Sequence, residues 1–241
     1  MKRPLSSRFF GSCVVAGTLL SLALGLTLHV LRPDYDPLRN FCSEYLVGPY
    51  SFLGTASVFV VAATLLMLLI GLRFSVCRSG FLTASCVLLG TMAFLLCVCA
   101  IFPIDVFPPD GRLPAFTSAG IIHIVASVLA LVSLIALLFT LTGAYKRDEQ
   151  WRSFSQMTPS IGSLILVSVA AFILAPFYLR GLAQRVTGLP VLAWLFLTGL
   201  RLREAAPEAL VKGALWFVKV VILATLVAAA VFRILSSIAP H

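Results

Sequence analysis

Four titratable side chains stand out because the chain around them is almost entirely apolar. His29 and His123 interrupt long hydrophobic stretches, while Glu44 and Asp105 lie in two short polar connections. A histidine beside a carboxylate is suited to proton transfer at neutral pH. One imidazole with two carboxylates is also a donor set that Zn²⁺ or a harder cation accepts. The two connections, residues 32–45 and 102–112, hold five of the nine carboxylates, so polar chemistry is concentrated there.

The composition predicts a membrane protein. Of 241 residues, 60% are hydrophobic and 11% are charged, whereas a soluble domain carries about 25% charged residues. The mean hydropathy is +1.06. A bilayer-spanning helix needs roughly 20 apolar residues, and the sequence offers seven candidates. We therefore expect an all-α, polytopic transmembrane bundle forming one domain, 1–241. Its expected helices cover residues 9–31, 50–72, 80–102, 119–143, 159–179, 186–203 and 213–235.

The sixth candidate is the shortest. Residues 186–200 contain no charge, but fifteen residues of helix rise only about 22 Å against a hydrocarbon core of roughly 30 Å. Spanning would require either that Arg185 and Arg201 extend outward to the headgroups at its two ends or that the bilayer thin locally. Pro190 would then lie in the first turn, where a proline removes no helical hydrogen bond.

The basic residues predict the orientation. With the N-terminus inside, eleven lysines and arginines fall on inner segments and six on outer ones, in agreement with the positive-inside rule. The net charge of +9 is therefore mainly a topology signal. Nucleic acid is not an expected partner, because no basic cluster is interleaved with aromatic residues. Both acidic connections lie outside in this orientation.

The helical spacing of small residues places the titratable groups inside the bundle. His29 follows Gly17, Ser21 and Gly25 at steps of four residues, and His123 is likewise surrounded by small residues. Such spacing marks close contact between helices in membranes. We therefore predict an outward-facing polar pocket between the first four helices. The residues expected to line it are Glu44, Asp105, His123, His29, Ser43 and Tyr45.

A combination of short motifs links the chain to a family. The motifs are Ser43-Glu44-Tyr45 with Gly48-Pro49-Tyr50, Phe102-Pro103-x-Asp105 and Gly120-x-x-His123. Over residues 9–203 the chain resembles the bacterial integral membrane proteins grouped as domain of unknown function 998, which are distantly similar to Frag1/DRAM-type membrane proteins. The resemblance implies a six-helix core, the bacterial inner membrane and motif positions at Glu44, Asp105 and His123. The resemblance implies no reaction. Residues 213–235 are not part of the family pattern and are expected to form an additional C-terminal helix.

No cofactor, disulfide or metal site is expected. Five of the six cysteines lie in or near apolar segments and are interpreted as packing residues. Cys42 alone lies in an outer connection, where it has no partner for an intrachain disulfide. The three histidines are dispersed and show no metal-ligand spacing.

Three classes of function remain open. The preferred one is a non-catalytic protein that binds a membrane lipid or small amphiphile in the outer pocket. The second is an accessory or scaffold subunit, which would contact a membrane protein partner through a small-residue face such as Ala224 and Ala228. The third is a membrane-embedded acid–base or metal-dependent enzyme acting on a lipid. Against it, Ser43 has no nucleophile elbow or oxyanion hole around it. For any single residue, a structural histidine–carboxylate pair is the simplest explanation.

Overall fold

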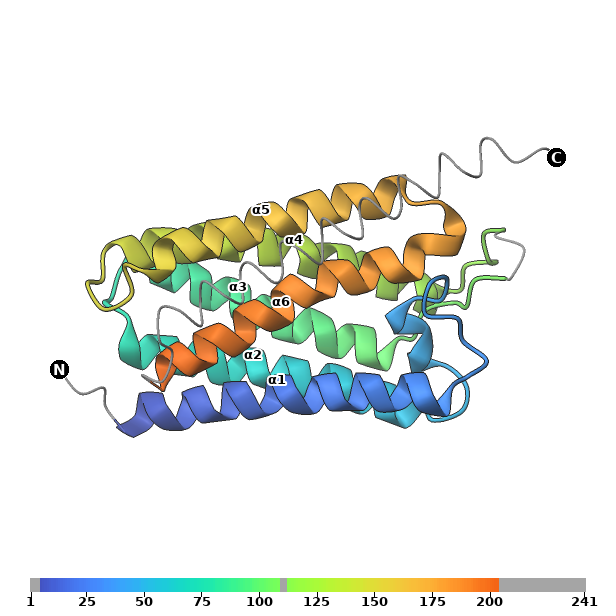
Figure 1. The fold of residues 1–241 in the computed structure, drawn as a ribbon, viewed down its shortest axis with the longest axis horizontal. Coiled ribbons are helices and arrows are strands. Elements are labelled where there is room, and N and C mark those ends of the chain that lie inside the picture. The colour runs from blue at the N-terminus through green and yellow to red at the C-terminus, as the bar shows by residue number, and fades with distance from the viewer. Residues whose placement is uncertain (1–4, 109–111, 204–241) are drawn as a thin grey trace.

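The computed structural model describes residues 5–108 and 112–203, and these form a bundle of six long helices (Figure 1). They are α1 (Leu5–Leu31), α2 (Ser51–Ser75), α3 (Gly80–Ile101), α4 (Ser118–Lys146), α5 (Phe154–Leu174) and α6 (Arg180–Leu202), with short 3₁₀ helices η1 (Cys42–Leu46) and η2 (Phe177–Leu179). All six are long and apolar enough to cross a membrane. The expected all-α architecture and six of its helices are confirmed. The expected helix at 213–235 lies outside the described residues.

The helices close into a ring in chain order. Each packs against the next, and α6 returns to pack against α1. The connection 32–50, the described parts 102–108 and 112–117 of the next one, and the connection 175–179 therefore meet at one end, on the right in Figure 1, which we call the cap end. The connections 76–79 and 147–153 meet at the opposite end. Both acidic connections are thus brought together at the cap end, as alternating helix directions require.

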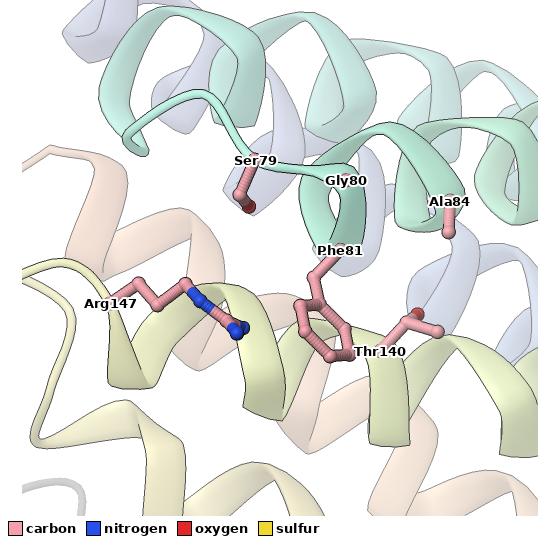
Figure 2. Close-up of a pocket in the computed structure, with 6 residues that line it drawn as sticks. All are labelled: Ser79, Gly80, Phe81, Ala84, Thr140 and Arg147. Atoms are coloured by element: carbon pink, nitrogen blue, oxygen red, sulfur yellow. The ribbon is translucent and has the colours of Figure 1, made fainter.

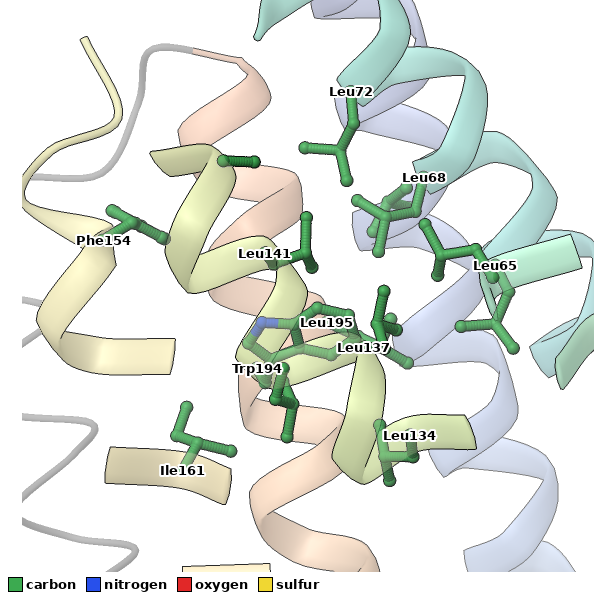
Figure 3. Packing of buried hydrophobic residues seen from close by; sticks show 14 of the residues in the cluster. Leu65, Leu68, Leu72, Leu134, Leu137, Leu141, Phe154, Ile161, Trp194 and Leu195 are labelled. Carbon is green, nitrogen blue, oxygen red and sulfur yellow. The ribbon is translucent and has the colours of Figure 1, made fainter. Parts of the chain in front are cut away.

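The ring is filled by large apolar side chains (Figure 3). Leu65 and Leu68 of α2 face Leu137 and Leu141 of α4, and Trp194 of α6 lies among them. All five are fully buried. Because lipid tails are as apolar as leucine, such contacts stabilise the bundle mainly through close packing.

The fifth and sixth helices differ from their expected bounds. Pro176 forces Ala175 into an extended conformation, so α5 ends at Leu174 and not at 179. The helix α6 then starts at Arg180, six residues before the expected start, and reaches Leu202. Its 23 residues rise about 34 Å, enough to span. Pro190 consequently lies inside the helix and not in its first turn.

The opposite end is held by a buried carboxylate. Asp148 accepts hydrogen bonds from the backbone N–H groups of Cys77 (2.8 Å), Gln150 (2.9 Å) and Trp151 (3.2 Å). The Trp151 ring stacks on Tyr145 with 4.8 Å between centroids. Asp148 therefore ties the α2–α3 connection to the α4–α5 connection, and its role is structural.

Candidate functional site

A cavity of about 240 Å³ lies at the cap end between α1, η1, α2, α3 and α4. Apart from its cysteines, its polar lining comes from His29 on α1, Ser43 and Tyr45 on η1, Ser57 on α2, and His123 and Ser127 on α4. Four of these six residues are among the six that the sequence predicts to line a pocket. The cavity's position agrees with the expected one between the first four helices.

His29 is held in one tautomer from both sides of its ring. Its Nε2 accepts a hydrogen bond of 2.9 Å from Arg185 Nε, a group that can only donate. The proton of the neutral ring must therefore be on Nδ1, which donates to the Gly25 carbonyl oxygen at 2.6 Å. The ring also packs against Tyr45, 5.2 Å between centroids. His29 thus forms a fixed wall of the cavity.

His123 ties α4 to the end of α3. Its Nδ1 lies 2.8 Å from the Phe102 carbonyl oxygen and 3.1 Å from that of Cys99. These are carbonyls of the last turn of α3, which have no partner within their own helix. The imidazole is 3% exposed. His123 therefore satisfies a helix end while another part of its ring lines the cavity.

Glu44 does not line the cavity. Its buried carboxylate accepts a hydrogen bond from the Asn40 side-chain amide, and the backbone N–H groups of Phe41 and Phe107 lie nearby. Glu44 therefore joins the two acidic connections to each other. The N-cap residue of η1 is Phe41, so the Asn40 side chain is engaged with Glu44 and not in capping.

Asp105 also turns away from the cavity. Its carboxylate accepts hydrogen bonds of 2.9 Å from the backbone N–H and the hydroxyl of Thr117, at the start of α4. A Cβ at Gly120 would overlap this carboxylate. The expectation that Glu44, Asp105 and His123 line one pocket is thus corrected to His123 alone, because both carboxylates are engaged in fastening the connections.

The buried position of Glu44 gives the cap end a pH dependence. Burial raises the pKa of the Glu44 carboxyl, and the Asn40 hydrogen bond offsets only part of this effect. The folded chain therefore keeps a proton that the unfolded chain loses, and stability falls as the pH rises from the ordinary glutamate pKa through the raised value. We expect the Tm to rise on acidification from neutral pH, and Glu44→Gln to raise the Tm at neutral pH and abolish this dependence.

Thermal unfolding between pH 4.5 and 8 checks this expectation. Asp34→Asn is the matched control, because the neighbouring Arg32 guanidinium holds the pKa of Asp34 below its ordinary value and so below this window. A Tm of Glu44→Gln that follows pH as the wild type does would contradict the assignment.

Arg185 is the site residue that sequence reasoning placed wrongly. It points into the bundle and not outward, donating from Nη1 to the carbonyl oxygens of Pro37 (2.7 Å) and Asn40 (2.8 Å) as well as from Nε to His29. Beside it, Gln184 accepts a hydrogen bond from the backbone N–H of Cys42. In the sequence, Arg185 is only a lone arginine before a short apolar stretch. That pattern is compatible with a side chain that points inward and with one that points outward.

A second hollow lies at the opposite end between α3 and α4 (Figure 2). It is larger, about 450 Å³, but it is a shallow groove lined mainly by Phe81, Gly80 and Ala84. Arg147 lies with its guanidinium 4.4 Å from the centre of the Phe81 ring, and Figure 2 shows the two side chains approaching each other. The groove contains none of the predicted site residues, so the cavity at the cap end is the better candidate.

The donor atoms do not gather as a metal centre. Among the described residues, no group of three or more histidine, cysteine or carboxylate side chains lies close enough to hold an ion. Within the same residues, neither cavity histidine forms a hydrogen bond with a carboxylate.

A closed ring of six apolar helices, with connections fastened at both ends, defines a multi-pass helical membrane protein. The model of the family described as "Protein of unknown function (DUF998)" matches residues 15–201, which is most of the chain. The chain belongs to this family, as its motifs predict. No curated protein and no solved structure gives a significant match.

Proposed function

We propose that this protein binds a lipid or another small amphiphile in the cavity at the cap end. The observation that carries the proposal is a cavity between the helices at the cap end of a bundle whose centre is filled by buried apolar side chains. A Cβ at Gly17, on α1, would collide with Thr64, whereas one at Gly25, two turns further on, would meet nothing within 4 Å. The helices separate where the polar side chains lie.

The lining of the cavity suits an amphiphile. Ser43, Tyr45 and Ser127 contribute polar groups, while Leu28 and Val58 are apolar. Pockets for whole drug-sized ligands measure about 300–1,000 Å³, so a cavity of about 240 Å³ has room for a headgroup and the first part of a chain. The rest of the chain would lie between helices in the bilayer.

The orientation and location are part of the proposal. The distribution of lysine and arginine favours an orientation with the cap end outside, and the family resemblance favours the inner membrane of a bacterium. The cavity would then take its ligand from the outer leaflet.

The binding role is favoured over acid–base catalysis by what the candidate groups already do. His29 has both ring nitrogens engaged, His123 has its Nδ1 engaged with carbonyl oxygens, and Glu44 and Asp105 hold donors outside the cavity. A general base needs a free nitrogen or oxygen within hydrogen-bond reach of the substrate. The residues are arranged to shape a cavity more than to move protons.

Filling the cavity tests the proposal. Gly25→Leu places a large side chain in the open space, and we expect it to abolish retention of a lipid that the wild type holds at about one per chain. The measurement is native mass spectrometry of protein purified in mild detergent, with the bound lipids identified after extraction. Gly188→Leu is the matched control, since Gly188 also lies on a helix and has nothing within 4 Å of its Cβ position.

Equal lipid retention by wild type and Gly25→Leu would overturn the proposal. If neither protein retained lipid but both carried the same co-purifying membrane protein, the accessory-subunit alternative would replace it. Release of a chemically altered lipid by the wild type would favour an enzyme.

A further inference from the structure

Arg185, which is partly buried at the cap end, carries a positive charge without a matching negative one in the described parts of the chain. It lies within the first two turns of α6, and no carboxylate in the described parts of the chain pairs with it. Its acceptors are neutral: His29 Nε2 and the carbonyl oxygens of Pro37, Asn40 and Gly181. Neutral acceptors satisfy N–H groups but do not cancel a charge, and an uncompensated charge in a membrane protein's interior is costly.

Two buried polar atoms beside this charge make no hydrogen bond of ordinary geometry. They are Arg185 Nη2 and Tyr45 Oη. Tyr45 is only 3% exposed and is a lining residue of the cavity. Burial raises the pKa of Tyr45, and the Arg185 guanidinium opposes this effect by its charge and by a loose contact with the hydroxyl, which leaves the hydroxyl proton without an acceptor. Buried donors are nearly always satisfied in native structures, so a missing acceptor at this position is informative.

Resting on the proposed function, we infer that the amphiphile bound in the cavity has an anionic headgroup that serves as the counter-ion of Arg185. An oxygen of a phosphate or carboxylate would accept hydrogen bonds from Tyr45 Oη and Arg185 Nη2. Both atoms are closed to solvent in this structure, so binding includes a small shift of the Tyr45 side chain. A neutral headgroup would satisfy the donors but leave the charge.

The two side chains divide the recognition between them. Arg185 provides the charge and reaches the site from behind His29, whose fixed ring holds the guanidinium through Nε. Tyr45 provides a neutral donor from the cavity wall. Because the Tyr45 hydroxyl makes no hydrogen bond of ordinary geometry and approaches only the Arg185 guanidinium, Tyr45→Phe removes little that holds the fold. This substitution separates ligand binding from folding.

Four probes with matched chemistry test the inference. Dodecyl phosphate and dodecanoate carry an anionic headgroup, dodecanol has the same chain without charge, and inorganic phosphate has the charge without a chain. Binding is measured as the rise in Tm, by tryptophan fluorescence, of protein in dodecyl maltoside. We expect the two anionic amphiphiles to bind at least about tenfold more tightly than dodecanol, as a charge-assisted hydrogen bond implies.

The variants locate the anion. Tyr45→Phe is expected to weaken dodecyl phosphate binding about tenfold or more while leaving the Tm without probe unchanged, and Arg185→Gln to remove the preference for the anion over dodecanol. Tyr50→Phe, on an exposed tyrosine at the same end, is the control and should bind as the wild type does. If Arg185→Gln does not fold, the Tyr45→Phe result decides alone.

Other outcomes would overturn the inference. Equal binding of dodecanol and dodecyl phosphate, both prevented by Gly25→Leu, would leave the cavity's function standing and exclude the anion. Stabilisation by inorganic phosphate alone would exclude a headgroup. A lower Tm of Tyr45→Phe with unchanged anion binding would show that the contact between Tyr45 and Arg185 stabilises the fold and does not bind the ligand. If no probe bound, the proposed function would fail too.

Discussion

Gly181→Val is expected to destabilise the bundle by about 3 kcal/mol, the upper end of what overpacking usually costs. Gly181 is the second residue of α6 and lies directly against the first connection. A Cβ there would overlap the Asn40 carbonyl oxygen and lie 2.8 Å from the Pro37 carbonyl oxygen and the Arg39 carbonyl carbon. These are backbone atoms, which cannot rotate aside as a side chain can.

The consequence extends to the cavity. Leu182 donates its backbone N–H to the Leu38 carbonyl oxygen at 2.9 Å, and Arg185 donates to two carbonyls of the same segment. Displacing this segment from α6 would break these bonds together. The Tm should fall by about 6–12 °C for a chain of this size, measured by tryptophan fluorescence in detergent. Gly188→Val, on the same helix with open space around it, is the control. Equal melting of the two variants would contradict the account.

Arg32→Met is expected to cost about 2 kcal/mol, because it leaves two partly buried carbonyl oxygens without their donor. Arg32 follows the last residue of α1 and is 4% exposed. Its Nη1 donates to the carbonyl oxygens of Val47 (2.9 Å) and Pro49 (3.1 Å), and its guanidinium lies 3.8 Å from the centre of the Tyr35 ring. Arg32 thereby fastens the turn that leads into α2.

The ion pair with Asp34 contributes little to this effect. The Arg32 Nη2 to Asp34 Oδ2 distance is 2.8 Å, but the Asp34 side chain is 58% exposed, and exposed pairs stabilise weakly. Asp34→Asn should therefore leave stability nearly unchanged while Arg32→Met lowers it, as measured by unfolding in mixed micelles of increasing SDS content. Equal losses in the two variants would show that the charge pair, and not the carbonyl contacts, holds the turn.

The sequence predicts the helices well because membrane insertion leaves a local signal. Twenty apolar residues in a row have few alternatives to a spanning helix. The interior position of His123 also follows from local spacing, since small residues on one face allow a neighbouring helix to approach. The start of the sixth helix is predicted less well. The uncharged stretch begins only after Arg185, whereas the helix already begins at Arg180.

The candidate site could be predicted only in part. Its location between the first four helices, and the presence there of His29, Ser43, Tyr45 and His123, follow from helical faces and topology. The directions of Glu44 and Asp105 do not, because side chains in connections orient toward donors that only the folded chain brings near, such as Thr117. Arg185 illustrates the same limit. An arginine beside an apolar stretch turns inward only if the fold brings hydrogen-bond acceptors from another part of the chain near it, here the carbonyl oxygens of Pro37 and Asn40.

The most direct test of the central claim is where an amphiphile contacts the protein. A fatty acid with a photoreactive diazirine near its headgroup, added to the reconstituted protein and activated by light, marks its neighbours for peptide mass spectrometry. The account predicts saturable labelling of the segments 42–46 and 123–127, competed by unlabelled fatty acid and absent in Gly25→Leu. Labelling confined to lipid-facing residues such as Phe52, Phe94 and Val132, without competition, would contradict it.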